Sequence, residues 1–297
     1  MKKHPNHPVS TFERLITEAL AIEAEQAQEA GALGFMARAM VQATMPHRKV
    51  DSPFFKRNNG AYTLTMMGSP MAGGLPYGTV PRLLLAWLTT EAVRTREREL
   101  ILGDSMSAFM RELDLVPTGG RWGSITRLKD QTTRLFSCTV TAFYKDAERT
   151  ELINRSVADR ATLWWHPKSP AQAGLWRSTV TLSEPFFQEV IENPVPIDMR
   201  ALKALKRSPL AIDIYAWLTY RMSYLSKPVE VPWVALAAQF GSEYGRLRDF
   251  REAFLGELRK VLTVYPEARV QEGNYGLLMS PSKPHIRKAT KALKQAD

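Results

Sequence analysis

The sequence predicts a mainly helical α+β protein that carries one structural unit twice. Residues 79–144 and residues 208–280 each read as a long helix, a short strand, a helix, a turn, a second helix and one or more further strands. The letters AWLT occur in the first helix of both, at residues 86–89 and 216–219. This order of elements is that of a winged helix. We therefore expect two tandem winged-helix domains, which is a repeat of fold rather than of sequence.

Composition narrows the class of protein. The 297 residues are 44% hydrophobic and 24% charged, which is enough apolar sequence for one large or two ordinary domains. The net charge of +10 favours a polyanionic partner, nucleic acid first and an anionic membrane second. A single cysteine, Cys138, excludes an intrachain disulfide and fits a cytoplasmic protein. We find no apolar stretch of membrane-spanning length, so no membrane partner is expected.

The domain organisation follows from composition shifts and turn signals. We expect a helical extension at residues 1–51, a first winged-helix domain at 52–195, a second at 196–282 and a basic tail at 283–297. The extension is predicted as one long helix from residue 12 to residue 42, capped by Ser10 or Thr11, which Gly31 and Gly34 can divide. The tail is predicted either to contact phosphates without specificity or to be a solvated polar segment.

In the first unit we predict a strand at 62–67 and a Gly/Pro-rich loop at 68–78. Ser105 or Asp104 is expected to cap the middle helix. Residues 137–144 alternate and predict a strand, and two later strands are expected to form a hairpin with it. The remaining predicted elements are an irregular segment at 46–59, helices at 79–95, 124–136 and 184–192, strands at 99–102, 161–166 and 176–182, and a connector at 193–196.

The second unit begins with a helix that Ser208 caps and Pro209 opens. After a strand at 229–231, an apolar helix at 232–240 and a Gly-containing turn at 241–245 lead into a longer helix. Five apolar residues at three- and four-residue spacing give that helix one inward face: Leu247, Phe250, Phe254, Leu258 and Val261. Residues 268–280 then predict a β-hairpin that turns at Gly273 and Asn274.

Motifs for catalysis are missing from the sequence. It contains no G-x-x-x-x-G-K-[ST] phosphate loop, and its five histidines are scattered. The Gly-rich run at 119–123 lies between two helices, so we interpret it as a turn. We therefore expect no enzyme activity, no metal site and no cofactor.

Basic residues at helical positions are the remaining candidates for a binding site. In a helix-turn-helix, residues at the leading end of the second helix reach base edges in the major groove, and arginine binds guanine through two hydrogen bonds. An ordinary αα-hairpin with a solvated basic face is the alternative interpretation. The candidate DNA-binding residues are Tyr244, Arg246, Arg248 and Arg251 in the second unit, and Arg121, Ser124, Arg127, Lys129, Gln131 and Arg134 in the first.

Four blocks of the sequence resemble a known family: LPYGTVPRLLLAWLTTEAVRT, SMSAFMRELDL, TGGRWGSITRLKDQTTRLF and SPLAIDIYAWLTYRMSYL. Together they resemble plasmid-encoded RepA replication initiators, over roughly residues 52–284. The resemblance implies a cytoplasmic bacterial protein that binds repeated origin sequences (iterons) in double-stranded plasmid DNA and opens adjacent A·T-rich DNA. It also implies host helicase and other replication factors as partners, and a possible homodimer.

Two other functions stay open from the sequence. A winged-helix transcriptional repressor would bind an operator without opening it. A replication nuclease or primase would need clustered carboxylates or histidines for a metal, and the sequence does not show them.

Overall fold

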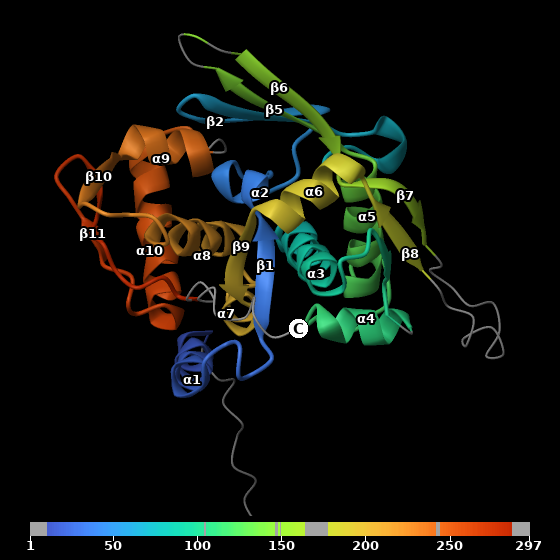
Figure 1. Ribbon diagram of the computed structural model, residues 1–297, viewed down its shortest axis with the longest axis horizontal. Helices are drawn as coiled ribbons and strands as arrows, with labels where there is room; N and C mark the ends of the chain where they lie inside the picture. Colours follow the sequence, from blue (N-terminus) through green and yellow to red (C-terminus); the bar gives the residue numbers. More distant parts are fainter. Residues whose placement is uncertain are drawn as a thin grey trace, which may run out of the picture.

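The computed structural model describes residues 11–103, 105–145, 148, 150–163, 178–241 and 244–286. The fold is α+β, with helices packed among several small antiparallel sheets (Figure 1). Apolar side chains from both halves of the chain form one continuous buried cluster, which runs from Leu15 to Met279. The two halves therefore share a core.

The first unit is built from three helices and a three-stranded sheet. Strand β4 pairs with β8, and β8 pairs with β7, so the sheet order is β4-β8-β7. Ser105 caps α4 by accepting a hydrogen bond from the Ala108 amide at 3.1 Å, as predicted. The elements are α3 (Thr79–Thr95), β4 (Glu99–Ile101), α4 (Met106–Glu112), α5 (Ser124–Phe136), β7 (Ala158–Thr162) and β8 (Thr179–Leu182).

The second unit repeats this plan. Its sheet has the order β10-β12-β11, in which the last strand again lies between the other two. Ser208 caps α8, accepting from the Ala211 amide at 3.2 Å, and Pro209 is its first residue, as predicted. The elements are α8 (Pro209–Met222), β10 (Val229–Pro232), α9 (Trp233–Phe240), α10 (Leu247–Val264), β11 (Val270–Glu272) and β12 (Gly276–Met279). Apart from β5 and β6, which stand between α5 and β7 in the first unit, the two units thus share an element order and a strand order.

Helices α3 and α8 occupy equivalent places in the two units and lie near the centre of the molecule, whereas α5 and α10 lie toward opposite ends of its long axis (Figure 1). Both central helices are buried on nearly all sides, and the AWLT residues of both are buried: Trp87 is 8% exposed and Trp217 is 6% exposed. Helices α3 and α8 therefore lie between α5 and α10 (Figure 1).

Another sheet, outside the repeat, has the order β2-β3-β5-β6. It contains β3 (Tyr62–Met67), which is confirmed, and β2 (Phe54–Asn59) in a segment predicted to be irregular. Strand β5 (Thr139–Lys145) pairs with β3 and with β6 (Thr150–Ser156). The predicted hairpin of the 137–144 strand with the two later strands is therefore wrong. Strands β7 and β8 pair with each other, and β8 also pairs with β4, because β3 and β6 take both edges of β5. Residues 164–166 and 176–177 of the two predicted strands lie outside the described residues.

The N-terminal extension differs from the predicted single helix. Helix α1 covers Thr11–Ala24, and the chain then turns, with Gly31 at a φ of 62°. Strand β1 (Leu33–Ala37) follows and pairs with β9 (Pro194–Asp198), which was predicted to be a connector. A side chain at Gly34 would require Met199 to move, because a Cβ would lie 2.5 Å from the Cγ and Sδ of Met199. The remaining elements are α2 (Arg38–Gln42), a 3-10 turn η1 (Pro70–Ala72), α6 (Glu184–Glu192) and α7 (Met199–Ala204).

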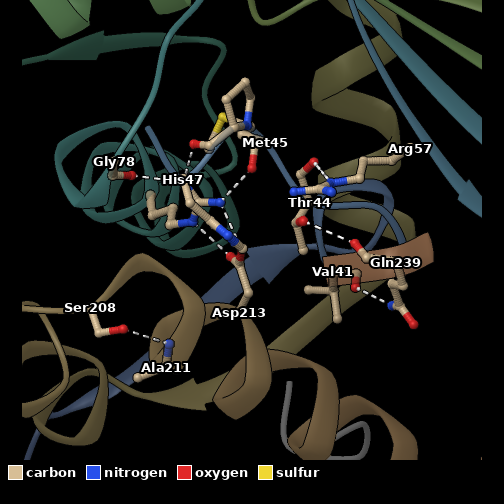
Figure 2. A network of polar contacts seen from close by, with 12 residues as sticks. Val41, Thr44, Met45, His47, Arg57, Gly78, Ser208, Ala211, Asp213 and Gln239 are labelled. Atoms are coloured by element: carbon tan, nitrogen blue, oxygen red, sulfur yellow. Dashed lines mark hydrogen bonds and ion pairs between the residues drawn. The ribbon is translucent and has the colours of Figure 1, made fainter. Parts of the chain in front are cut away.

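A buried ion pair joins the two central helices (Figure 2). Arg82 on α3, 2% exposed, donates from Nε and Nη2 to both carboxylate oxygens of Asp213 on α8, each at 2.7 Å. Its other N–H groups donate to the carbonyls of Met45, Pro46 and Gly78, so all five guanidinium donors are used. Such a pair is stable in the interior only when its polar atoms are satisfied in this way.

His47 completes this junction. Its Nε2 lies 2.8 Å from Oδ2 of Asp213 (Figure 2). Burial alone would raise the pKa of Asp213, but the charge of Arg82 and the hydrogen bonds from His47 and Arg82 outweigh it and hold the pKa below its usual value. Burial lowers the pKa of His47, despite the nearby carboxylate. The pair is thus an ionised carboxylate and guanidinium beside a neutral imidazole.

Candidate nucleic-acid interface

The leading end of α10 forms an exposed basic surface. Phe250, Phe254, Leu258 and Val261 are buried, as the spacing predicted, whereas Leu247 at the first turn is 43% exposed. The inward stripe turns the other side of the helix to solvent. Residues 242 and 243 of the preceding turn lie outside the described residues.

Two arginines project from this end of the helix. The side chain of Arg248 is 79% exposed and that of Arg246 is 70% exposed. Arg246 Nε donates to Oδ2 of Asp249 at 2.8 Å, and Arg248 Nε lies 3.6 Å from Oδ1 of the same carboxylate. Two guanidinium groups share one carboxylate, so this end of the helix keeps a net positive charge. The positive end of the helix dipole adds to it.

Arg251 has a different environment from its neighbours. Its guanidinium forms an ion pair with Glu272 on β11, with Nε 2.7 Å from Oε1, and lies over the Trp233 ring at 5.5 Å. The contact ties α10 to the β11–β12 hairpin. A neutralised and stacked arginine is suited to positioning the hairpin rather than to reading a base directly.

Tyr244 packs within the second unit, at the turn before α10. Its ring packs edge-on against Phe250 at 5.7 Å between centroids, and its amide donates to the Gly241 carbonyl at 3.0 Å. The Tyr244 side chain therefore holds the turn between α9 and α10 against α10.

The hairpin contributes an exposed aromatic residue that the sequence analysis did not select. Tyr275 is 79% exposed at the turn between β11 and β12. Glu230 on β10 orders this turn by accepting hydrogen bonds from the amides of Tyr275 (2.6 Å) and Gly276 (2.9 Å). Gly276 cannot be replaced there, since a Cβ would collide with the Val231 carbonyl oxygen. The sequence signal for Tyr275 was a single aromatic residue directly after the predicted turn at Gly273 and Asn274.

In the first unit, several of the predicted DNA-binding residues are bonded within the protein or buried. Arg121 and Arg127 are exposed, and the Arg121 guanidinium lies over the ring of Trp122 at 5.2 Å. Ser124 already has intramolecular partners: its Oγ donates to the Val116 carbonyl at 2.5 Å and accepts from the Thr118 amide at 2.9 Å. Its role is to close the turn before α5.

Gln131 and Arg134 face the interior of the first unit. Gln131 is 1% exposed and accepts from the Tyr77 amide at 2.8 Å. Arg134 is 8% exposed, donates to Asp130 at 2.9 Å and to the Leu75 carbonyl at 3.3 Å, and lies over the Tyr77 ring. Both hold the 68–78 loop against α5, so their assignment as DNA contacts is replaced by this structural one. Lys129 is half-buried, and burial lowers its pKa.

The sequence held a signal for this correction. Gln131 stands three residues after the buried Leu128, and Arg134 stands three residues after Gln131, which is the spacing of neighbours on one side of a helix. A polar residue on that stripe is placed to bond inward. Among the predicted residues, the exposed basic ones are thus Arg121 before α5 and Arg127 on it, and Arg246 at the N-cap of α10 and Arg248 in its first turn.

The family model for plasmid-encoded RepA protein matches residues 75–231. The match covers more than half of the chain, from the loop before α3 to the end of β10. The chain belongs to the plasmid-encoded RepA family. Membership confirms the resemblance in the sequence blocks and supports a role in replication initiation. The matched region of this RepA-family chain ends before α9 and α10, so the leading end of α10 lies outside it.

A crystal structure of domains 2 and 3 of RctB, solved as a selenomethionine derivative, is similar in fold to this RepA-family chain. It has a TM-score of 0.55 and 12% sequence identity, over 84% of this chain and 99% of that one. At this identity the likeness concerns the fold alone, and it extends over both repeated units. None of the curated proteins matches the chain at a significant level of sequence similarity.

Two further properties concern the described part of the chain. Within it, none of the helices is long and apolar enough to cross a membrane. Among the same residues, no group of three or more His, Cys, Asp or Glu side chains is placed to hold a metal ion.

Proposed function

We propose that this protein is a plasmid replication initiator that binds repeated origin DNA through two winged-helix domains, with α10 as the main reading helix. The observation that carries the proposal is the exposure of Arg246 and Arg248 at the N-terminal end of α10, in a unit whose helix and strand order is that of a winged helix. RepA-family membership supports the role in initiation.

The proposed mechanism uses binding energy and no catalytic step. Arg248 is placed to bind a guanine edge in the major groove, and Arg246 a base or a phosphate beside it. Tyr275 in the hairpin turn lies against the neighbouring sugar–phosphate backbone. Arg251 and Glu272 keep the hairpin and the helix in one relative orientation, so that both contacts form together.

The first unit makes the second contact. Arg121 and Arg127 bind phosphates, and the buried junction between α3 and α8 fixes the distance between the two units. Several copies on neighbouring repeats then strain the adjacent A·T-rich duplex, because the deformation energy of DNA depends on its sequence. Opened DNA is the substrate that host helicase and other replication factors require, in the bacterial cytoplasm.

The test is binding of the full chain to its own origin region, with footprinting at single-nucleotide resolution. We expect regularly spaced protected repeats. The double variant Arg246→Ala/Arg248→Ala should lose specific binding at least tenfold, since one bidentate arginine–guanine contact is worth about 1–3 kcal/mol. Arg259→Ala is the matched control, because Arg259 is also exposed on α10 but near its opposite end.

Two outcomes would contradict the proposal. Equal losses in the double variant and in Arg259→Ala would show that α10 contributes charge without reading sequence. Protected sites that never gain permanganate reactivity in the neighbouring A·T-rich DNA would indicate a repressor instead of an initiator.

A further inference from the structure

Helix α1 carries an apolar stripe that no described part of the chain covers. Phe12, Ile16 and Leu20 follow one another at four-residue spacing and are 58%, 41% and 61% exposed. Residues at this spacing lie on one side of a helix. Leu15 and Ile22, on the neighbouring side, are buried where α1 packs on α7 and α10. Helix α1 therefore has two apolar sides, of which one is occupied.

The net charge of residues 11–30 is opposite in sign to that of the whole chain. The chain carries +10, but residues 11–30 contain one basic residue, Arg14, whose Nη2 donates to the Ala204 carbonyl. The acidic residues of this stretch are Glu13, Glu18, Glu23, Glu25 and Glu29. An acidic helix repels DNA and a second acidic copy of itself, so the charge favours a basic occupant for the stripe.

The chain after β12 runs directly to this helix. A cavity of about 210 Å³ lies between them, lined by Ala19, Ile22 and Glu23 of α1 and by Lys283, His285 and Ile286. The His285 ring stacks on Tyr265 at 4.7 Å, and its Nδ1 lies 2.8 Å from the Tyr215 hydroxyl. The Tyr265 hydroxyl also donates to the Lys283 carbonyl at 2.6 Å. Residues 283–286 are thus anchored beside the C-terminal half of α1.

The sequence beyond this anchor complements the stripe. Residues 287–297 lie outside the described residues, and their sequence, RKATKALKQAD, contains Arg287, Lys288, Lys291 and Lys294 against one acidic residue. Ile286, Ala289 and Leu293 have the three- and four-residue spacing of one apolar helix side. Seven residues of helix span about 10 Å and eight about 12 Å, so the reach from Ile286 to Leu293 is close to that from Phe12 to Leu20.

We propose that residues 287–297 bind along the exposed stripe of α1 in the same molecule, antiparallel to it. Leu293 then covers Ile16, and the lysines lie beside Glu13 and Glu23. This contact withholds the basic residues of the tail from DNA phosphates, so it limits non-specific binding and leaves α10 to select the site. The inference does not depend on the proposed function, since the contact is intramolecular.

Disulfide crosslinking in the full chain tests the contact. Ile16→Cys combined with Leu293→Cys should form an intramolecular disulfide under mild oxidation, at a rate independent of protein concentration. The control is Thr17→Cys with Leu293→Cys, because exposed Thr17 lies one residue further and about 100° around the helix. Burial raises the pKa of the native Cys138 thiol to about 12, so this thiol does not compete.

Each outcome decides the matter. A crosslink that forms much faster in the Ile16→Cys pair than in the Thr17→Cys pair supports the proposal. Equal rates in the two pairs, or no crosslink in either, overturn it. Disulfide-linked dimers that increase with concentration also overturn it, because they would make a second copy the occupant of the stripe.

A second measurement tests the consequence for DNA. In the full chain, Phe12→Ser/Ile16→Ser/Leu20→Ser should free the tail and steepen the salt dependence of binding to a non-specific duplex, by a slope of up to about 3–4 for four freed basic residues. In a chain that stops at residue 286, the same triple change should leave the slope unaltered. A steeper slope in both chains would show that the tail is not involved.

Discussion

Helices α5 and α10 have the same place in their units but use their basic residues differently. In α10 the basic side chains at the leading end point to solvent, and one acidic residue, Asp249, serves both Arg246 and Arg248. In α5 the buried Arg134 and Gln131 hold a loop that the second unit does not have. Two units can therefore share an element order and still differ in which basic side chains they expose to solvent. In the first unit, part of α5 packs against the interior, whereas in the second unit the leading end of α10 is exposed to solvent.

The largest effect is expected at the Arg82–Asp213 ion pair, which joins the two units. Arg82→Ala leaves Asp213 buried without its partner, so we expect the free energy of unfolding to fall by about 3–5 kcal/mol in denaturant titrations. Because the pair joins α3 to α8, both units should lose stability together. Arg94→Ala is the control on the same helix, since its pair with Glu91 is exposed and worth at most about 0.5 kcal/mol. Similar losses in the two variants would mean that the junction does not couple the units.

Arg248→Ala should act on DNA binding without affecting the fold. The side chain is 79% exposed, so the free energy of unfolding should change by less than about 0.5 kcal/mol. Discrimination between the origin repeat and a single-base variant of it should fall by about 1–3 kcal/mol, measured by competition binding. A uniform loss over all sequences would show that Arg248 contacts phosphate only.

Arg134→Ala should show the reverse behaviour. Losing the bonds to Asp130 and Leu75 should lower the free energy of unfolding by about 1–2 kcal/mol, while sequence discrimination stays unchanged. Arg127→Ala, on the exposed side of α5, is the matched variant and should leave stability unaltered. A change in discrimination with Arg134→Ala would restore this residue to the interface.

The smallest effect concerns pH. Burial lowers the pKa of His47 and of His285, so the unfolded chain binds protons more readily than the folded one as the pH falls through the usual histidine value of 6.5. Stability should therefore decline between about pH 7 and pH 5. The lowered pKa of Asp213 adds a further loss only near and below its usual value of 3.8. His47→Gln should flatten the decline in the histidine range, and an unchanged slope would assign the effect elsewhere.

Local patterns predicted many of the helices and strands, inside and outside the repeated units. The bounds of α3, α5, α6 and β3 follow from caps, prolines and alternation, because these signals lie within the element itself. The strands β1 and β9 were missed because their short sequences gain stability from pairing with each other across the chain. The inward role of Arg134 depends on the 68–78 loop, whose position against α5 no local pattern encodes. Trp122 and Tyr275 are exposed only by virtue of the tertiary fold.

The pairing of β1 with β9 also sets an order of events during synthesis. Leu33 pairs with Asp198, so during synthesis β1 has no partner strand until the whole first unit has emerged from the ribosome. Contacts so distant in sequence slow folding. The first unit is then closed by a segment made after it, at the moment when the second unit begins to appear.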